Sequence, residues 1–270
     1  MAEDMPYSML AGRGTSGLIF LCDHASNALP DEFGLLGLEA AQLRRHIGFD
    51  IGAADVTRAL AETFRAPALM TTYSRLLIDP NRGEDDPTLV MKLSDRAVVP
   101  GNAGVGVRQR QDRLERFHRP YHAAIDRAIL QSVSQGTVPV LVSIHSFTEN
   151  WRGRDRPWHL GCLWDLDDRA PRHFLKAFAH DEAVVGDNQP YDGALKNDCM
   201  YRHGTAMGLA HLLIEVRQDL IGDASGARAW AHRLVPALRR IDEDPDCHVV
   251  RHYGSRTGPV ETRSLMRLDS

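Results

Sequence analysis

The sequence VPVLVSI, at residues 138–144, is apolar along almost its whole length. A short, nearly continuous apolar run is typical of a β-strand buried on both faces, as strands of a parallel sheet are. Four more runs of this kind lie at residues 17–22 (GLIFLC), 66–73 (APALMTTY), 160–164 (LGCLW) and 210–216 (AHLLIEV). The sequence therefore predicts a central sheet that contains these five buried strands.

Helical stretches separate these runs, because apolar residues recur there at intervals of three or four. The stripes are Val56, Leu60 and Phe64; Leu114, Phe117, Tyr121, Ile125 and Ile129; and Trp230, Leu234 and Leu238 within residues 226–241. Pro120 interrupts the second stripe and should kink it or divide it into two helices. Strands that alternate with helices predict an α/β fold, here a three-layer α/β/α sandwich with a mixed, mostly parallel central sheet.

Length and composition are those of one globular domain. The chain has 270 residues, within reach of a single hydrophobic core, so we expect one domain over residues 1–270. The core should span about residues 17–243, because residues 244–270 are polar, lack periodicity and predict a C-terminal tail. Residues 82–106 are rich in Asp, Pro and Gly and predict a long loop, which in a compact domain is usually functional.

Charge and cysteine spacing argue against several classes of protein. The formal net charge is −4, whereas a general nucleic-acid-binding protein normally carries a basic excess. Cys22, Cys162, Cys199 and Cys247 form no C-x-x-C pair and predict neither a zinc ribbon nor a disulfide framework. The N-terminus does not read as a signal peptide, and no apolar run is long enough to span a membrane. We therefore expect a cytoplasmic protein with neither nucleic-acid nor membrane partners.

Polar side chains follow the predicted strands where ligands bind in α/β sheets, at the carboxyl ends of the strands. His24 follows the first run, His145 follows residues 138–144, and Glu215 lies near the end of the last run. Arg75 and Arg82 follow the second run. Imidazoles that bind Zn²⁺, a carboxylate base and guanidinium groups for an anionic substrate are the components of a metal-dependent hydrolase. Alternatively, the histidines are structural, the arginines are surface charges and Glu215 forms a buried salt bridge.

Six motifs, in this order, resemble the N-formylglutamate amidohydrolase family over roughly residues 17–240. They are DHASNALP, HIGFDIGA, YSRLLIDPNR, IHSFTENWRGRDRPWHLG, VGDNQPYDG and IEVRQDLI. The segments LVSIHSF and LLIEVR, and the pair Asn81-Arg82, also resemble the zinc carboxypeptidases. The resemblance implies a zinc-carboxypeptidase-like (phosphorylase/hydrolase-like) fold and one Zn²⁺ ion per chain.

The metal ligands implied by the resemblance are His24, Asp50 and His145. Carboxypeptidases take their first two ligands from an H-x-x-E run, but the third residue after His24 here is Asn27. A neutral amide is a poor Zn²⁺ ligand, and the resemblance matches an aspartate of the family to Asp50, which is the expected second ligand, with Asn27 as the alternative. Asp50 is also placed to cap the helix that follows it.

The resemblance also implies roles for the remaining residues. Glu215 would take a proton from water and return it to the leaving amine. Arg75 would stabilise the oxyanion, and Asn81 and Arg82 would hold a substrate carboxylate. His203 matches a histidine of the family and is expected to lie near the substrate. Asp79 is expected to brace one of the arginines, and the other histidines, such as His46, His118 and His122, are expected to be structural or exposed.

The reaction implied by the resemblance is hydrolysis of N-formyl-L-glutamate to formate and L-glutamate, which would place the chain in histidine degradation. One alternative keeps the chemistry and changes the substrate to another N-acylamino acid or a small peptide. The other is a catalytically silent anion-binding protein on the same fold. The expected partner is a small anionic substrate, and the sequence leaves the oligomeric state open.

Overall fold

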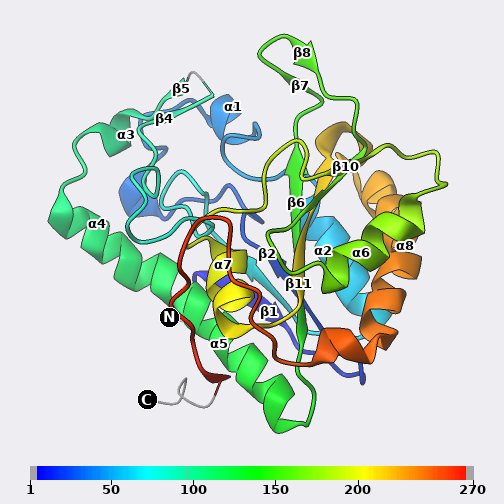
Figure 1. Ribbon diagram of the computed structural model, residues 1–270. Helices are drawn as coiled ribbons and strands as arrows, with labels where there is room; N and C mark the ends of the chain where they lie inside the picture. The colour runs from blue at the N-terminus through cyan, green and yellow to red at the C-terminus, as the bar shows by residue number, and fades with distance from the viewer. Residues whose placement is uncertain (1–4, 96, 266–270) are drawn as a thin grey trace.

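A seven-stranded sheet lies at the centre of the computed structural model, which describes residues 5–95 and 97–265 (Figure 1). Four of its six neighbouring strand pairs are parallel, and the pairs β1–β3 and β9–β11 are antiparallel. The predicted mixed, mostly parallel sheet is therefore confirmed. Across the sheet the strands are β1 (Tyr7–Leu10), β3 (Ala68–Thr71), β2 (Leu18–Cys22), β6 (Val140–Phe147), β11 (His211–Arg217), β9 (Leu160–Leu163) and β10 (Val185–Asp187).

The five predicted strands occupy the five interior positions of the sheet. Strands β2, β3, β6 and β9 are buried along their whole length, which explains their nearly continuous apolar sequences. The two edge strands were not predicted from the sequence. Three of the four residues of β1 are exposed, and β10 has only three residues, so neither has an apolar run.

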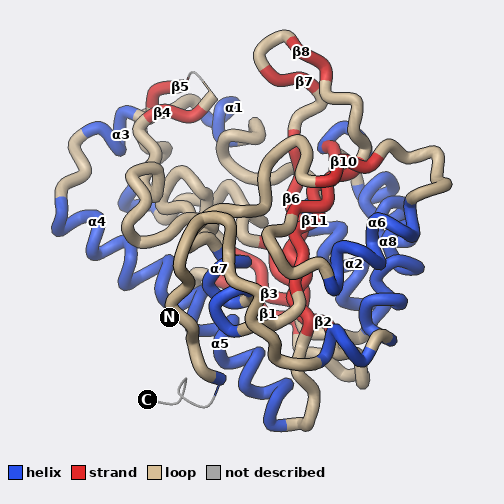
Figure 2. Tube along the Cα trace, in the orientation of Figure 1, coloured by secondary structure: helices blue, strands red, loops and turns tan. Residues whose placement is uncertain are grey.

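Helices cover both faces of the sheet, which confirms the three-layer arrangement (Figure 2). One face packs against α2 (Ala53–Phe64), α6 (Arg169–Phe178) and α8 (Ala224–Glu243). The other face packs against α5 (Arg119–Ser134) and α7 (Cys199–His203). Each face has its own apolar core, so the sheet is buried on both sides, as its sequence predicts.

Helix α5 is the second part of a longer helical segment. It follows α4 (Val107–Arg113) through a π-helical turn at Leu114–His118, and Pro120 lies in its first turn. The π-helical turn directly before it is a local irregularity in the helical hydrogen bonding, which a proline, having no N–H, cannot continue regularly. The predicted irregularity near Pro120 is thus a π-helical turn within one continuous helical segment, and the segment is not divided into two separate helices.

Short elements surround the carboxyl ends of the strands. The predicted loop at residues 82–106 contains the hairpin β4 (Leu93–Ser94) and β5 (Ala97–Val98), followed by α3 (Pro100–Ala103). A second hairpin, β7 (Asn150–Trp151) and β8 (Arg154–Asp155), follows β6. The remaining short elements are α1 (Ala40–Leu43) and 3₁₀ turns at Asp31–Phe33, Thr205–Met207, Gln218–Leu220 and Pro245–His248.

The segment predicted as a polar tail runs along the body of the protein. Cys247 is buried, the Arg251 amide donates to the Gly208 carbonyl at 2.8 Å, and Arg263 forms an ion pair with Asp126. Residues 266–270 of this segment lie outside the described residues. None of the helices in the described ranges has the length and apolar character needed to cross a membrane.

Candidate active site

Three side chains from separate segments meet at the carboxyl edge of the sheet. His24 follows β2, Asp50 precedes α2, and His145 lies in β6. Asp50 Oδ2 is 2.8 Å from His145 Nδ1 and 3.3 Å from His24 Nδ1. All three residues are buried, and their potential ligand atoms lie within 4.8 Å of one another. The structure thus brings together the three predicted metal ligands, which we call the first triad.

Backbone geometry holds Asp50 in place. Its amide donates to the His24 carbonyl at 2.9 Å, and Gly52 two residues later has a φ of 78°. A side chain at Gly52 would be strained, and its Cβ would lie 2.0 Å from the Ile221 carbonyl oxygen. The N-cap of α2 is Gly52, so Asp50 does not cap this helix. The Asn27 side chain instead donates to the Leu43 carbonyl and is not among the residues that line the cavity described below.

Two further carboxylates fix the orientation of the histidine rings. His24 Nε2 is 2.7 Å from Asp79 Oδ1, and His145 Nε2 is 3.0 Å from Asp23 Oδ2. Each ring therefore has a carboxylate at both nitrogens, with Nδ1 facing Asp50 and Nε2 facing Asp79 or Asp23. Metal-binding histidines in proteins are held in this way.

The electrostatics of the first triad favour a cation. Burial opposes ionisation of Asp50, but His24 and His145 hold its pKa well below the usual value. Burial also lowers the pKa of His145, but hydrogen bonds to Asp23 and Asp50 raise it well above its usual value. Two imidazole nitrogens and a carboxylate oxygen are the protein ligands of a catalytic zinc site. The donor set and its supporting carboxylates therefore fit zinc.

Glu215 lies beside the first triad without a partner of its own. It is opposite His145 in the parallel pairing of β11 with β6, and only 6% of it is exposed. Its Oε2 has no hydrogen-bond partner, and no ion pair involves this carboxylate in the described part of the chain. Burial is the main reason why its pKa is raised to about 7. The alternative that Glu215 forms a structural salt bridge is therefore not observed.

A cavity of about 260 Å³ opens onto the first triad. The predicted catalytic residues Glu215 and Arg75 line it as well, and so do Asn81 and Arg82, which are predicted to bind the substrate. Arg75 Nη1 donates to Asp50 Oδ1 at 3.1 Å, and Arg75 Nη2 is 3.5 Å from Asp79 Oδ2. Asp79 thus braces an arginine, as predicted, and also holds a histidine of the first triad.

Asn81 and Arg82 are positioned by the backbone around them. The side-chain oxygen of Asn81, Oδ1, accepts a hydrogen bond from the backbone amide of Cys199 at the start of α7. The backbone amide of Asn81 donates to Asp79 Oδ1. Arg82 Nη1 donates to the Asn81 carbonyl at 2.7 Å. Arg82 keeps further N–H donors for a ligand in the cavity, because a guanidinium group has five.

The structure does not bring His203 to this cavity. His203 is fully buried in α7, on the side of the sheet covered by α5, and it is not one of the cavity-lining residues. Its Nε2 lies 2.8 Å from His122 Nδ1. The expectation that His203 approaches the substrate is corrected accordingly, because α7 directs its side chain toward α5.

Two residues of this site were not among the predicted ones. Asp23 supports His145, and His46 lines the cavity with its Nδ1 3.6 Å from Asp50 Oδ1. Burial lowers the pKa of His46 to about 4, so this ring is neutral near pH 7. Both residues belong to motifs that carry the predicted ligands: Asp23 directly precedes His24, and His46 is four residues before Asp50.

Comparisons with known proteins show the family of this chain. The family model for N-formylglutamate amidohydrolase matches residues 16–222. A solved gene product of Agrobacterium tumefaciens is 30% identical, with a TM-score of 0.85, over 89% of this chain and 96% of that one. An N-formylglutamate amidohydrolase from Ralstonia eutropha shares the fold at 21% identity and a TM-score of 0.68, over 88% and 97% of the two chains. None of the curated proteins matches the chain. This chain belongs to the N-formylglutamate amidohydrolase family.

Proposed function

We propose that this protein is a zinc-dependent hydrolase that cleaves N-formyl-L-glutamate to formate and L-glutamate. The observation that carries the proposal is the unpaired, buried carboxylate of Glu215 next to the first triad. A carboxylate with a pKa near 7 is suited to accept and return a proton at neutral pH.

His24, Asp50 and His145 would hold the zinc ion. When bound, zinc supplies Lewis acidity, which polarises a substrate carbonyl and lowers the pKa of water. Asp79 and Asp23 keep the Nε2 atoms of the two histidines protonated, so that both rings present Nδ1 to the first triad.

Glu215 acts as the general base and then as the general acid. It removes a proton from the water molecule whose oxygen forms the new bond to the formyl carbon. It then delivers this proton to the amide nitrogen as the C–N bond breaks, which releases formate and the free amine. No ion pair has to be broken for this proton transfer, because Glu215 forms none with residues 5–95 or 97–265.

The two arginines of the cavity recognise negative charge. Arg75, held by Asp50, stabilises the charge that develops on the carbonyl oxygen. Arg82 and the amide of Asn81 bind a carboxylate of the amino-acid portion, for which a guanidinium fork is well suited. A cavity of about 260 Å³ is slightly below the usual range for drug-sized ligands, which favours a small substrate over a polymer.

Metal analysis combined with a substrate panel tests this proposal. We expect the purified chain to hydrolyse N-formyl-L-glutamate, to lose activity on treatment with a chelator and to regain it with Zn²⁺. The panel contains N-formyl and N-acetyl derivatives of glutamate, aspartate and leucine, together with a γ-glutamyl dipeptide. If the enzyme hydrolyses another N-acyl derivative or the dipeptide faster than N-formyl-L-glutamate, that compound class is the substrate instead. Binding of these compounds without turnover would instead identify an anion-binding protein.

A further inference from the structure

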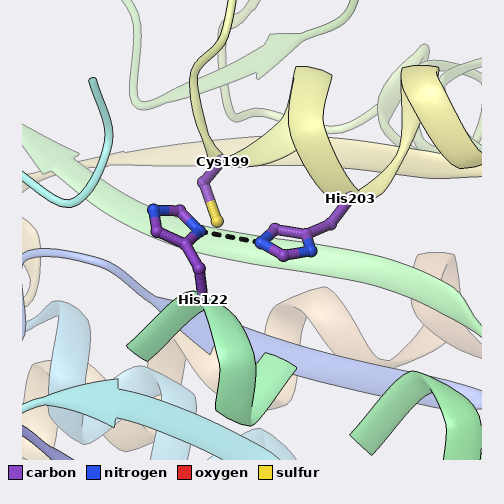
Figure 3. A group of neighbouring side chains, drawn as sticks. All are labelled: His122, Cys199 and His203. Carbon is purple, nitrogen blue, oxygen red and sulfur yellow. Dashed lines mark hydrogen bonds between the residues drawn. The ribbon is translucent and has the colours of Figure 1, made fainter. Parts of the chain in front are cut away.

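A second group of metal-binding side chains lies away from the cavity. His122 from α5 and Cys199 and His203 from α7 face one another, with ligand atoms within 4.8 Å (Figure 3). Cys199 and His203 are one helical turn apart, so both side chains emerge from the same face of α7. All three residues are buried and none lines the cavity of the first triad. We call them the second triad.

The outer nitrogen of each ring in the second triad is a hydrogen-bond donor. His122 Nε2 is 3.0 Å from the Pro80 carbonyl oxygen, and His203 Nδ1 is 3.0 Å from Asp126 Oδ1. A carbonyl oxygen and an ionised carboxylate only accept, so both ring nitrogens carry protons. The other oxygen of Asp126 forms an ion pair with Arg263 at 2.8 Å, which favours the ionised carboxylate.

The inner nitrogens therefore face each other as two acceptors. In neutral rings, His122 Nδ1 and His203 Nε2 each present a lone pair, and they are 2.8 Å apart. Two acceptors at this distance need a proton or another cation between them.

We propose that His122, Cys199 and His203 bind a transition-metal cation of the zinc type at a second site. Two imidazoles and a thiolate are ligands that Zn²⁺ prefers. Pro80 and Asp126 then act as the supporting partners that metal-binding histidines usually have. Binding replaces the thiol proton of Cys199, which leaves to solvent.

The second site is a structural one. The residues of the second triad are at most 1% exposed, so a substrate has no access from solvent to a cation held there. Zinc–nitrogen bonds of about 2.0–2.1 Å in a tetrahedral arrangement require the two nitrogens to move apart by roughly half an ångström. The cation links α5 to α7, which lie next to each other on one face of the sheet. It should therefore stabilise this layer.

Cobalt spectroscopy tests the proposal, because of the two triads only the second contains a cysteine, whose thiolate would bind the cation. The metal-free chain is titrated with Co²⁺, and thiolate-to-cobalt charge transfer is followed in the near-ultraviolet. We expect a charge-transfer band, together with about one more equivalent of bound Co²⁺ than the first triad alone would take. Cys199→Ser should abolish the band and remove this equivalent. His145→Ala, which disrupts the first triad, should keep the band even if the proposed function is wrong.

Cys247→Ser is the matched control, because the Cys247 thiol is the potential ligand of another cluster, with His173 and Asp244. The band should persist in this variant. Loss of the band in Cys247→Ser but not in Cys199→Ser would overturn the proposal. So would the absence of a thiolate band in the wild-type chain, a result that does not depend on the folding of any variant.

Discussion

The first and second triads have similar donors but different surroundings. Each contains two histidines, and in each ring the nitrogen that faces away from the triad lies against a hydrogen-bond acceptor. The third potential metal ligand is Asp50 in the first triad and Cys199 in the second. The first triad opens onto a cavity that also contains Glu215 and two arginines, whereas the second triad is sealed. Catalysis therefore depends on free space and a nearby proton acceptor more than on the ligand set itself.

The two triads also differ in their origin within the fold. The first is assembled from three segments at the edge of the sheet, and the second from two helices on one face. Asp23 connects them. It accepts a hydrogen bond from His145. Burial is the main reason why the pKa of the Cys199 thiol is raised, and the charge and hydrogen bond of Asp23 raise it further. The two sites are thus adjacent but separated by this buried carboxylate.

The strongest test of the comparison is His145→Ala. Losing one of three protein ligands leaves too few donors for a catalytic site, so activity should fall to background and the first cation should be lost. The thiolate–cobalt band should remain. Cys199→Ser is the control and should show the reverse pattern, with the first cation retained and the melting temperature lowered. Full metal occupancy in His145→Ala would refute the assignment of the first triad.

Glu215→Gln separates proton transfer from metal binding. The amide keeps the size of the side chain but cannot accept a proton, so kcat should fall by about 10²–10⁴-fold with KM and metal content nearly unchanged. The melting temperature should not fall, because Glu215 has no ion pair to lose. Glu182→Gln, at an exposed position, is the matched control. A destabilised Glu215→Gln variant with near-normal kcat would contradict the catalytic role.

Asp79→Asn and Asp126→Asn compare the supporting carboxylates of the two triads. Each substitution should weaken cation binding about 10–100-fold at its own triad, because the supporting acceptor orients the histidine ring. Asp79→Asn should also lower activity, whereas Asp126→Asn should mainly weaken the thiolate–cobalt band. Competition with a chelator of known affinity measures both constants. Equal effects of one substitution on both triads would show that they are not independent sites.

Arg82→Lys has the smallest expected effect and concerns only the cavity. Lysine keeps the charge but cannot form a two-pronged contact with a carboxylate, so KM should rise by roughly tenfold or more. A substrate analogue whose carboxylate is replaced by an amide should have a high KM with the wild type, and the Arg82→Lys substitution should raise that KM little further. The exposed Arg108→Lys is the control. Unchanged KM values for both substrates would mean that Arg82 does not anchor the carboxylate.

The sequence by itself determined the layers of the fold and most of the candidate site. Periodicity and apolar runs are local properties, so the five interior strands and helices α2, α5 and α8 could be predicted from them. The order of polar residues at strand ends indicated His24, His145 and Glu215. The edge strand β1 could not be found in this way, because its exposed residues carry no apolar pattern.

Only the tertiary structure decided which polar residues meet. A glycine turn and a backbone hydrogen bond to His24 place Asp50 rather than Asn27 in the first triad, although both lie at loop positions in the sequence. The second triad had a weak signal, the Cys199-x-x-x-His203 spacing, but its third member is 77 residues away from Cys199 in the chain. Contacts between segments far apart in sequence depend on strand register and on how helices pack on the sheet, and local patterns do not contain that information.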